Sequence, residues 1–217
     1  MVGTKESKGE YIAIHDSDDI WDLEKLEKQY NLMKTTDCDL SFCKMRRINM
    51  EGKEQVVPNK DIEMGDGLYH QLLKGNFIAS ITIMMKRELA YKVEFDPEVR
   101  RFTDWDFVLR VVKADYKISY LPEILATSYI QNDSSAVTQN KYKSIEFIYK
   151  RYKNEIMPHP DVHAVFLYNL GVNCSVNNRK LANTHFMNSL KLQLSGKVLF
   201  RLAVNKLGIT NFLKSIK

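Results

Sequence analysis

The chain has 217 residues, of which 44% are hydrophobic and 27% charged, and its formal net charge is +5. This composition excludes a disordered chain, predicts one globular domain with at most a small appendage, and gives no reason to expect nucleic acid as a partner. The sequence has no apolar run of the roughly 18 to 20 residues that a membrane-spanning helix needs, and its first residues lack the apolar stretch of a signal peptide. We therefore predict a cytoplasmic protein, with peripheral contact to the inner face of the cell membrane as the alternative.

The first candidate site follows a strand predicted at residues 11–15. Asp16-Ser17-Asp18-Asp19 places three carboxylates at the end of this strand, where like charges raise one another's pKa unless a cation or a donor neutralises them. Carboxylates at positions i and i+2 can direct oxygens at one Mg²⁺ or Mn²⁺ ion, which takes further ligands from substrate phosphates. The alternative is an acidic helix N-terminus, in which Asp18 or Asp19 caps the helix that follows.

Helices and strands alternate after this acidic turn. Helical spacing predicts an amphipathic helix whose apolar face consists of Leu23, Leu26, Tyr30 and Met33. Two β-rich segments at 40–50 and 53–57 flank Glu51-Gly52, which is typical of a hairpin turn. The remaining elements predicted in this part are a short helix at 66–74, a strand at 78–85, a helix that begins near Asp104, and strands at 117–121 and 124–130.

A second acidic segment begins the helix near Asp104. Thr103-Asp104-Trp105-Asp106 precedes an apolar stripe with the spacing i, i+3, i+4 and i+7. Taken alone, Asp104 is most simply interpreted as the N-cap of this helix.

The sequence becomes helical throughout from residue 141, so we place a domain boundary near residue 140. Helices are predicted at 141–156, 162–175, 179–193 and 197–214, because Pro, Asn-Asn and Ser-Gly, which interrupt helices, lie between these segments. The last of these is basic and amphipathic, a pattern that fits either an anionic membrane surface or a helix that covers the core with a solvated basic side.

Four stretches, taken in order, resemble the second half of a family 2 glycosyltransferase, an inverting enzyme of GT-A fold. They are Gly9 to Trp21 with the acidic turn, Gly75 to Leu89, Phe95 to Arg110 with Thr103-Asp104-Trp105-Asp106, and Leu121 to Tyr129. The resemblance spans roughly residues 9–138. It implies an α/β fold, a partial GT-A (Rossmann-like) mixed sheet with flanking helices in residues 1–140, followed by a helical extension in residues 141–217.

The resemblance also implies roles for the acidic residues. Asp18 would coordinate the divalent ion, Mg²⁺ or Mn²⁺, that bridges the nucleotide diphosphate, and Asp16 and Asp19 would support nucleotide-sugar binding. Asp104 would be the general base that activates an acceptor hydroxyl, with Trp105 and Asp106 on the acceptor side, although core packing is the alternative for Trp105. The partners implied are a nucleotide-sugar donor and a saccharide or lipid-linked saccharide acceptor in bacterial polysaccharide or glycoconjugate synthesis.

Two departures from the family pattern are visible. Only fifteen residues precede Asp16, whereas the family places two to three strands and helices with a nucleotide-binding half before the acidic turn, so we expect a truncated chain. Many relatives carry an Arg and a His where this chain has Ile130 and Asn132.

The alternative function is an inactive remnant or a non-enzymatic interaction module that pairs with another chain.

Overall fold

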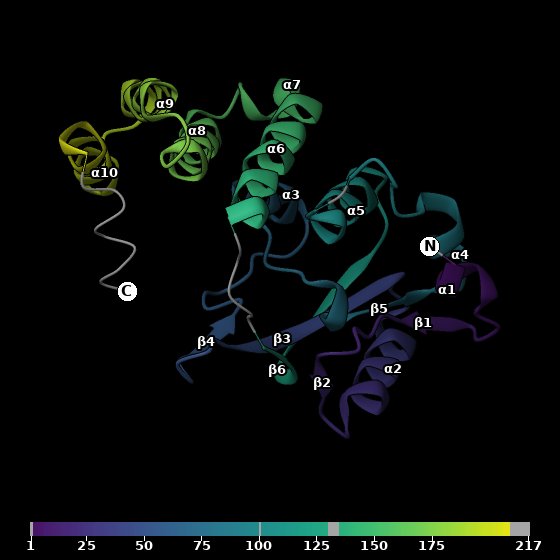
Figure 1. The fold of residues 1–217 in the computed structure, drawn as a ribbon. Helices are drawn as coiled ribbons and strands as arrows, with labels where there is room; N and C mark the ends of the chain where they lie inside the picture. Colours follow the sequence, from purple (N-terminus) through teal and green to yellow (C-terminus); the bar gives the residue numbers. More distant parts are fainter. Residues whose placement is uncertain (1, 100, 130–134, 209–217) are drawn as a thin grey trace. The chain divides into compact units, whose positions relative to one another are not determined.

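The structure is a computed structural model that describes residues 2–99, 101–129 and 135–208. It divides into two compact units, residues 1–132 and residues 133–217. The first unit is an α/β fold around a mixed sheet, and the second is built from helices (Figure 1). The α/β class predicted from the sequence is confirmed.

The sheet of the first unit places its strands in the order β1-β5-β3-β6-β2, with β4 paired to β3 alone. The pair β3 and β6 is parallel, whereas the other pairs are antiparallel. The predicted hairpin at 40–57 is confirmed as β3 and β4. The strand bounds are Tyr11–Ala13 (β1), Ile20–Trp21 (β2), Leu40–Ile48 (β3), Glu54–Val57 (β4), Ile83–Lys86 (β5) and Ile118–Tyr129 (β6).

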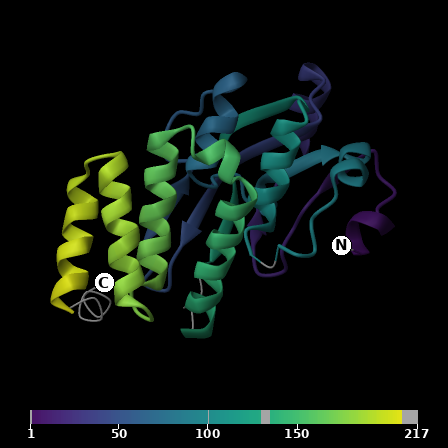
Figure 2. The ribbon, with the colours of Figure 1, turned by 90° about the horizontal axis from the view of Figure 1, so that it is seen from above.

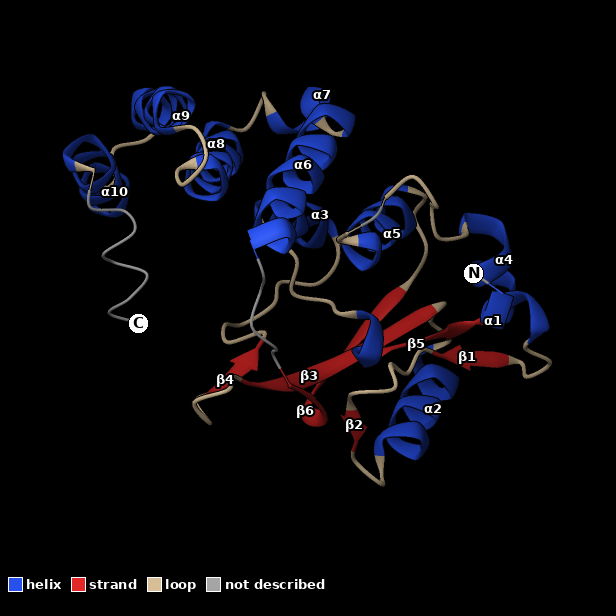
Figure 3. Cartoon of the chain, in the orientation of Figure 1, coloured by secondary structure: helices blue, strands red, loops and turns tan. Residues whose placement is uncertain are grey.

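Helices cover both faces of this sheet, with α2 on one face and α3 and α5 on the other (Figures 1 and 3). On the second face the indole N–H of Trp105 donates to Leu72 O over 2.7 Å, which joins α5 to α3. The predicted helices at 66–74 and from the Asp104 region are confirmed. The helix bounds are Val2–Glu6 (α1), Lys25–Thr36 (α2), Asp66–Lys74 (α3), Arg87–Val93 (α4) and Thr103–Lys113 (α5).

The predicted apolar face of the helix after the acidic turn is largely wrong. Leu23, Leu26 and Tyr30 are exposed, and the buried positions of α2 are Lys25, Gln29 and Met33. The two polar residues can be buried because they bind each other and the sheet: Lys25 Nζ donates to Gln29 Oε1 over 2.6 Å. Gln29 Nε2 in turn donates to a β3 hydroxyl and a backbone carbonyl. Hydrogen bonding, rather than apolar burial, therefore fixes this side of α2 on the sheet.

Two strand predictions also need correction. The segment 78–85 is a strand only from Ile83, because Ser80–Thr82 forms a 3₁₀ helix closed by a hydrogen bond from Thr82 N–H to Ala79 O. The segments 117–121 and 124–130 are one strand, β6, whose register against β3 shifts at Lys44. The first of these corrections matters for function, because the 3₁₀ turn places Ser80 beside the acidic residues.

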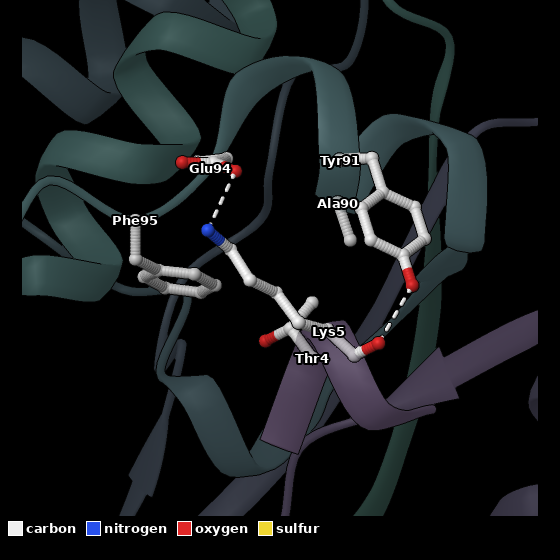
Figure 4. Close-up of a pocket in the computed structure, with 6 residues that line it drawn as sticks. All are labelled: Thr4, Lys5, Ala90, Tyr91, Glu94 and Phe95. Carbon is white, nitrogen blue, oxygen red and sulfur yellow. Dashed lines mark hydrogen bonds and ion pairs between the residues drawn. The ribbon is translucent and has the colours of Figure 1, made fainter. Parts of the chain in front are cut away.

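The N-terminal helix α1 is fixed to α4 by two polar contacts (Figure 4). Lys5 Nζ lies 3.6 Å from a carboxylate oxygen of Glu94, and the Tyr91 hydroxyl donates to Lys5 O over 3.0 Å. The pocket that these residues line has a volume of about 20 Å³, which is room for a single water molecule. It is therefore too small to hold a nucleotide or a sugar.

The second unit consists of helices packed one against the next, as the sequence predicts (Figure 2). Gly171 lets α8 approach α9 closely, because a Cβ at this position would lie 2.6 Å from the Phe186 ring. Arg179 donates to the carbonyls of Asn205 and Lys206, which ties the start of α9 to the end of α10. The bounds are Ser135–Arg151 (α6), Lys153–Ile156 (α7), Pro160–Cys174 (α8), Arg179–Leu192 (α9) and Gly196–Leu207 (α10).

Candidate active site

The acidic turn lies directly after β1, at an exposed end of the strand. Asp19 N–H donates to Asp16 O over 3.2 Å, which closes the turn, and the side chains of Asp16 and Asp18 are exposed. The helix α2 begins only at Lys25, with Glu24 at its N-cap and the strand β2 in between. Neither Asp18 nor Asp19 caps a helix, so the interpretation of this turn as a helix cap is wrong.

Asp19 differs from its neighbours because it is partly buried. Burial raises the pKa of its carboxyl group, and a hydrogen bond from the Ser128 side chain opposes this rise. Ser128 belongs to β6. The turn is therefore attached to the sheet through Asp19, while Asp16 and Asp18 remain accessible to a ligand.

Asp104 lies in the first turn of α5, but it is not the N-cap. The N-cap position is occupied by Phe102. Asp104 Oδ1 accepts a hydrogen bond of 2.8 Å from the backbone N–H of Trp105, and its carboxylate also accepts from the Ser80 backbone N–H and the Asn76 side chain. Burial raises the pKa of Asp104, while these donors lower it. A carboxyl with a raised pKa is suited to accept a proton near neutral pH.

Ser80 connects the two acidic segments. Its hydroxyl donates to Asp16 Oδ2 over 3.1 Å, and its backbone N–H donates to the Asp104 carboxylate. The 3₁₀ turn thus holds Asp16 and Asp104 close to each other, although they are 88 positions apart in the sequence. Sequence reasoning missed Ser80, because it interpreted residues 78–85 as an apolar strand, and it gave no role to Asn76, which precedes that segment.

Sequence reasoning also missed Arg47, which lies on β3 near both acidic segments. Its guanidinium is partly buried and is close enough to Asp104 and Asp19 for both charges to act on its pKa. Burial has the larger effect and lowers that pKa. The available signal was a pair of arginines, Arg46-Arg47, at the end of a strand that is otherwise mostly apolar.

Trp105 and Asp106 follow Asp104 but are buried in the core of the unit. Trp105 is 5% exposed, and its ring packs edge-on against Phe102. Asp106 is fully buried, and its Oδ2 accepts a hydrogen bond of 2.8 Å from Arg110 Nε. Both side chains stabilise the position of α5, and in this way they position Asp104.

The acidic turn has the donor atoms that a hard divalent cation prefers. Within the part of the chain that the structure describes, no three histidine, cysteine or acidic side chains converge on one point. A cation here would take one or two carboxylate oxygens from the turn, which fits Mg²⁺ or Mn²⁺ with water and phosphate as the remaining ligands. Ile130 and Asn132, where the family pattern has Arg and His, lie outside the described residues.

Comparisons with known proteins agree on one family. Residues 1–93 match the model of "Glycosyl transferase family 2". TuaG of Bacillus subtilis is 29% identical over 150 residues, covering 67% of this chain and 57% of that protein. The amylovoran biosynthesis glycosyltransferase AmsB of Erwinia amylovora is 26% identical (67% and 50% covered). The UDP-Glc:alpha-D-GlcNAc-diphosphoundecaprenol beta-1,3-glucosyltransferase WfgD of Escherichia coli is 28% identical (65% and 53% covered).

Solved structures show the same fold. Residues 1–349 of S. aureus TarS superpose with a TM-score of 0.52 at 14% identity, covering 97% of this chain and 66% of that one. The chain spans about half the length of the curated relatives it matches. The match over residues 1–93 and the related sequences show that the chain is similar to proteins of glycosyl transferase family 2.

Proposed function

We propose that the protein transfers a sugar from a nucleotide-sugar donor to an acceptor hydroxyl, with inversion at the anomeric carbon, in the synthesis of a bacterial polysaccharide. The observation that carries this proposal is the link through Ser80 between Asp16 and Asp104. It brings an exposed acidic turn and a carboxyl of raised pKa into one site. The names of AmsB and WfgD, an amylovoran biosynthesis enzyme and a glucosyltransferase that uses UDP-Glc, support the substrate class.

The donor side of the proposed site is the acidic turn. Asp18 would hold Mg²⁺ or Mn²⁺, and Asp16 and Asp19 would bind the nucleotide sugar beside it. The ion would supply positive charge where the departing nucleoside diphosphate becomes more negative. Ser80 restrains Asp16, so the turn needs little reordering when the donor binds.

The acceptor side is the start of α5. The Asp104 carboxylate would accept the proton of the acceptor hydroxyl as its oxygen attacks the anomeric carbon from the face opposite the diphosphate. The bond from the anomeric carbon to the diphosphate oxygen then breaks, and its electron pair leaves with the nucleoside diphosphate. Attack and departure on opposite faces invert the configuration of the sugar.

A lipid-linked acceptor would require access to a membrane surface, and the second unit offers a candidate for this contact. Leu199, Phe200 and Leu207 of α10 are each more than half exposed, among Lys197 and Lys206. Exposed apolar side chains beside lysines favour binding to anionic lipid, to which each lysine adds about 1 kcal/mol. The residues after Gly208 lie outside the described part, and no helix in the described part is long and apolar enough to cross a bilayer.

Sedimentation with vesicles tests this membrane contact. We expect the protein to bind phosphatidylglycerol vesicles more strongly than phosphatidylcholine vesicles, and the double change Leu199→Ser with Phe200→Ser to abolish the difference. Val176→Ser, which changes an exposed apolar side chain elsewhere in the second unit, is the matched control. Equal binding by the double variant and the unchanged protein would rule out α10 as the membrane contact.

A panel of donors tests the proposed transfer. The protein is incubated with UDP-Glc, UDP-GlcNAc and GDP-Man, each with MnCl₂ and a saccharide acceptor, and release of the nucleoside diphosphate is measured. We expect one donor to be consumed, the rate to fall after EDTA treatment and with Asp18→Asn, and the product linkage to be inverted by NMR. A retained linkage would contradict the mechanism, and no consumption of any donor would favour a non-enzymatic interaction module.

A further inference from the structure

The guanidinium of Arg47 lies near both acidic segments of the candidate site. In the register of the sheet, Arg47 on β3 lies opposite Ser128 on β6. Ser128 in turn binds Asp19 with its side chain. Asp104 also acts electrostatically on Arg47, so the second carboxyl lies near the guanidinium as well. The positive charge therefore lies near both the donor turn and the residue assigned to the acceptor.

Arg47 is partly buried, yet its side chain forms no hydrogen bond or close ion pair with any residue that the structure describes. Arginine side chains that lose solvent are normally held by such pairs, because the five donors of the guanidinium must be satisfied. The preceding residue, Arg46, does form an ion pair, although not a hydrogen bond: its Nε lies 3.2 Å from Glu54 Oε2. The free donors of Arg47 thus remain for a ligand.

We propose that Arg47 binds a phosphate group of a substrate at the centre of this site. The planar guanidinium presents paired donors that match two oxygens of one phosphate, and partial burial strengthens the attraction. This inference rests on the proposed transfer reaction, in which the phosphate belongs either to the nucleotide-sugar donor or to a diphosphate-linked acceptor.

Arg46 provides a matched control, because it is the next residue on the same strand and carries the same charge. Its partner Glu54 is on β4, and both side chains are substantially exposed. Loss of an exposed ion pair of this kind costs little stability. Arg46→Gln therefore removes the same charge from β3 at a side chain that pairs with Glu54.

The experiment measures binding of UDP with MnCl₂ by calorimetry, and the KM for a short-chain alkyl diphosphate of GlcNAc as acceptor. We expect Arg47→Gln to weaken one of these two by about 10- to 100-fold, the loss of a charged hydrogen bond. Arg47→Lys, which keeps the positive charge but lacks the paired donors of the guanidinium, should weaken binding less. Arg46→Gln should leave both measurements unchanged. Weaker UDP binding identifies the donor phosphate, and a raised acceptor KM identifies the acceptor phosphate.

The outcomes separate this inference from the reaction on which it rests. If the unchanged protein binds UDP or transfers a sugar, and both Arg47 variants match it in the two measurements, Arg47 has no role in phosphate binding. If the unchanged protein neither binds UDP nor consumes any donor, the proposed reaction itself is wrong. Thermal melting of Arg47→Lys within a few degrees of the unchanged protein shows that a loss of binding is not a loss of fold.

Discussion

Asp16 and Asp104 are held in one site by Ser80, whose hydroxyl donates to Asp16 Oδ2 over 3.1 Å while its backbone N–H donates to the Asp104 carboxylate. A single residue therefore restrains the acidic turn after β1 and the start of α5. Because transfer requires donor and acceptor groups to be aligned, this link is expected to matter more for rate than for stability.

Replacing Ser80 with alanine tests the link. Ser80→Ala keeps the hydrogen bond from the backbone N–H to Asp104 but removes the hydroxyl that restrains Asp16. We therefore expect kcat/KM to fall by about tenfold, which corresponds to the loss of about 1.4 kcal/mol, the net contribution of one hydrogen bond. The control is Ser119→Ala, which removes a hydroxyl that bonds only Thr36 in the described part. Equal rates for the two serine variants would show that Ser80 does not align the site.

Asn76 should control the pH dependence of the reaction. Its side chain donates to the ionised form of Asp104 and so lowers the pKa of that carboxyl, against the upward effect of burial. Asn76→Ala removes the donor, so the pKa rises further and a larger fraction of Asp104 is protonated at a given pH. We expect the acidic limb of the profile of kcat/KM to move to higher pH. If the acidic limb does not move, the group whose ionisation produces that limb is not Asp104.

Asp106 and Asp104 should respond differently to the same change. Asp106 is fully buried and paired with the partly exposed Arg110, so Asp106→Asn weakens a buried charged hydrogen bond and should destabilise the protein by about 1.5 to 3 kcal/mol. Asp104→Asn should leave the melting temperature nearly unchanged. Thermal denaturation of both variants distinguishes a structural carboxyl from a chemical one, and a stable Asp106→Asn protein would contradict the assignment.

Lys25 predicts a pH-dependent stability. Burial lowers its pKa from 10.5 to about 8, so between these values the unfolded chain binds more protons than the folded one. The free energy of unfolding therefore rises with pH across this window. We expect Lys25→Met to flatten this rise by up to about 3 kcal/mol in urea titrations from pH 7.5 to 10.5.

Lys53→Met, on an exposed turn, is the control for Lys25. It should keep the full pH dependence of the unchanged protein. If Lys25→Met keeps the same slope as this control, Lys25 is protonated equally in the folded and unfolded states, and its burial has no electrostatic cost.

The sequence predicts the fold where local patterns and tertiary packing agree, and it misleads where they do not. The hairpin around Gly52, which has a φ of 75°, and the stripe of α5 follow directly from turn chemistry and periodicity. The face of α2 does not, because the hydrogen bonds of Lys25 and Gln29 to each other and to the sheet depend on residues that are distant in sequence. Propensity cannot report such contacts.

The candidate site shows the same division. The spacing of Asp16 and Asp18 predicts a cation site, whereas the roles predicted for Asp19 and Asp104 come from the family resemblance. Ser80 and Arg47 are predicted by neither, because their roles depend on a 3₁₀ turn and on the register between β3 and β6. Residues that connect a site are harder to predict than the residues they connect, since their side chains carry no motif.

The most direct test of the proposed site is the rate of nucleoside diphosphate release by Asp104→Asn, measured with the donor and acceptor that the unchanged protein uses. Asp115→Asn is the control, because it makes the same replacement just beyond the other end of α5, at an exposed residue with a φ of 58° that asparagine tolerates. If Asp104 is the general base, Asp104→Asn lowers kcat by about 10²- to 10⁴-fold while Asp115→Asn keeps the original rate. Equal rates for the two variants would contradict the assignment of Asp104 as the base.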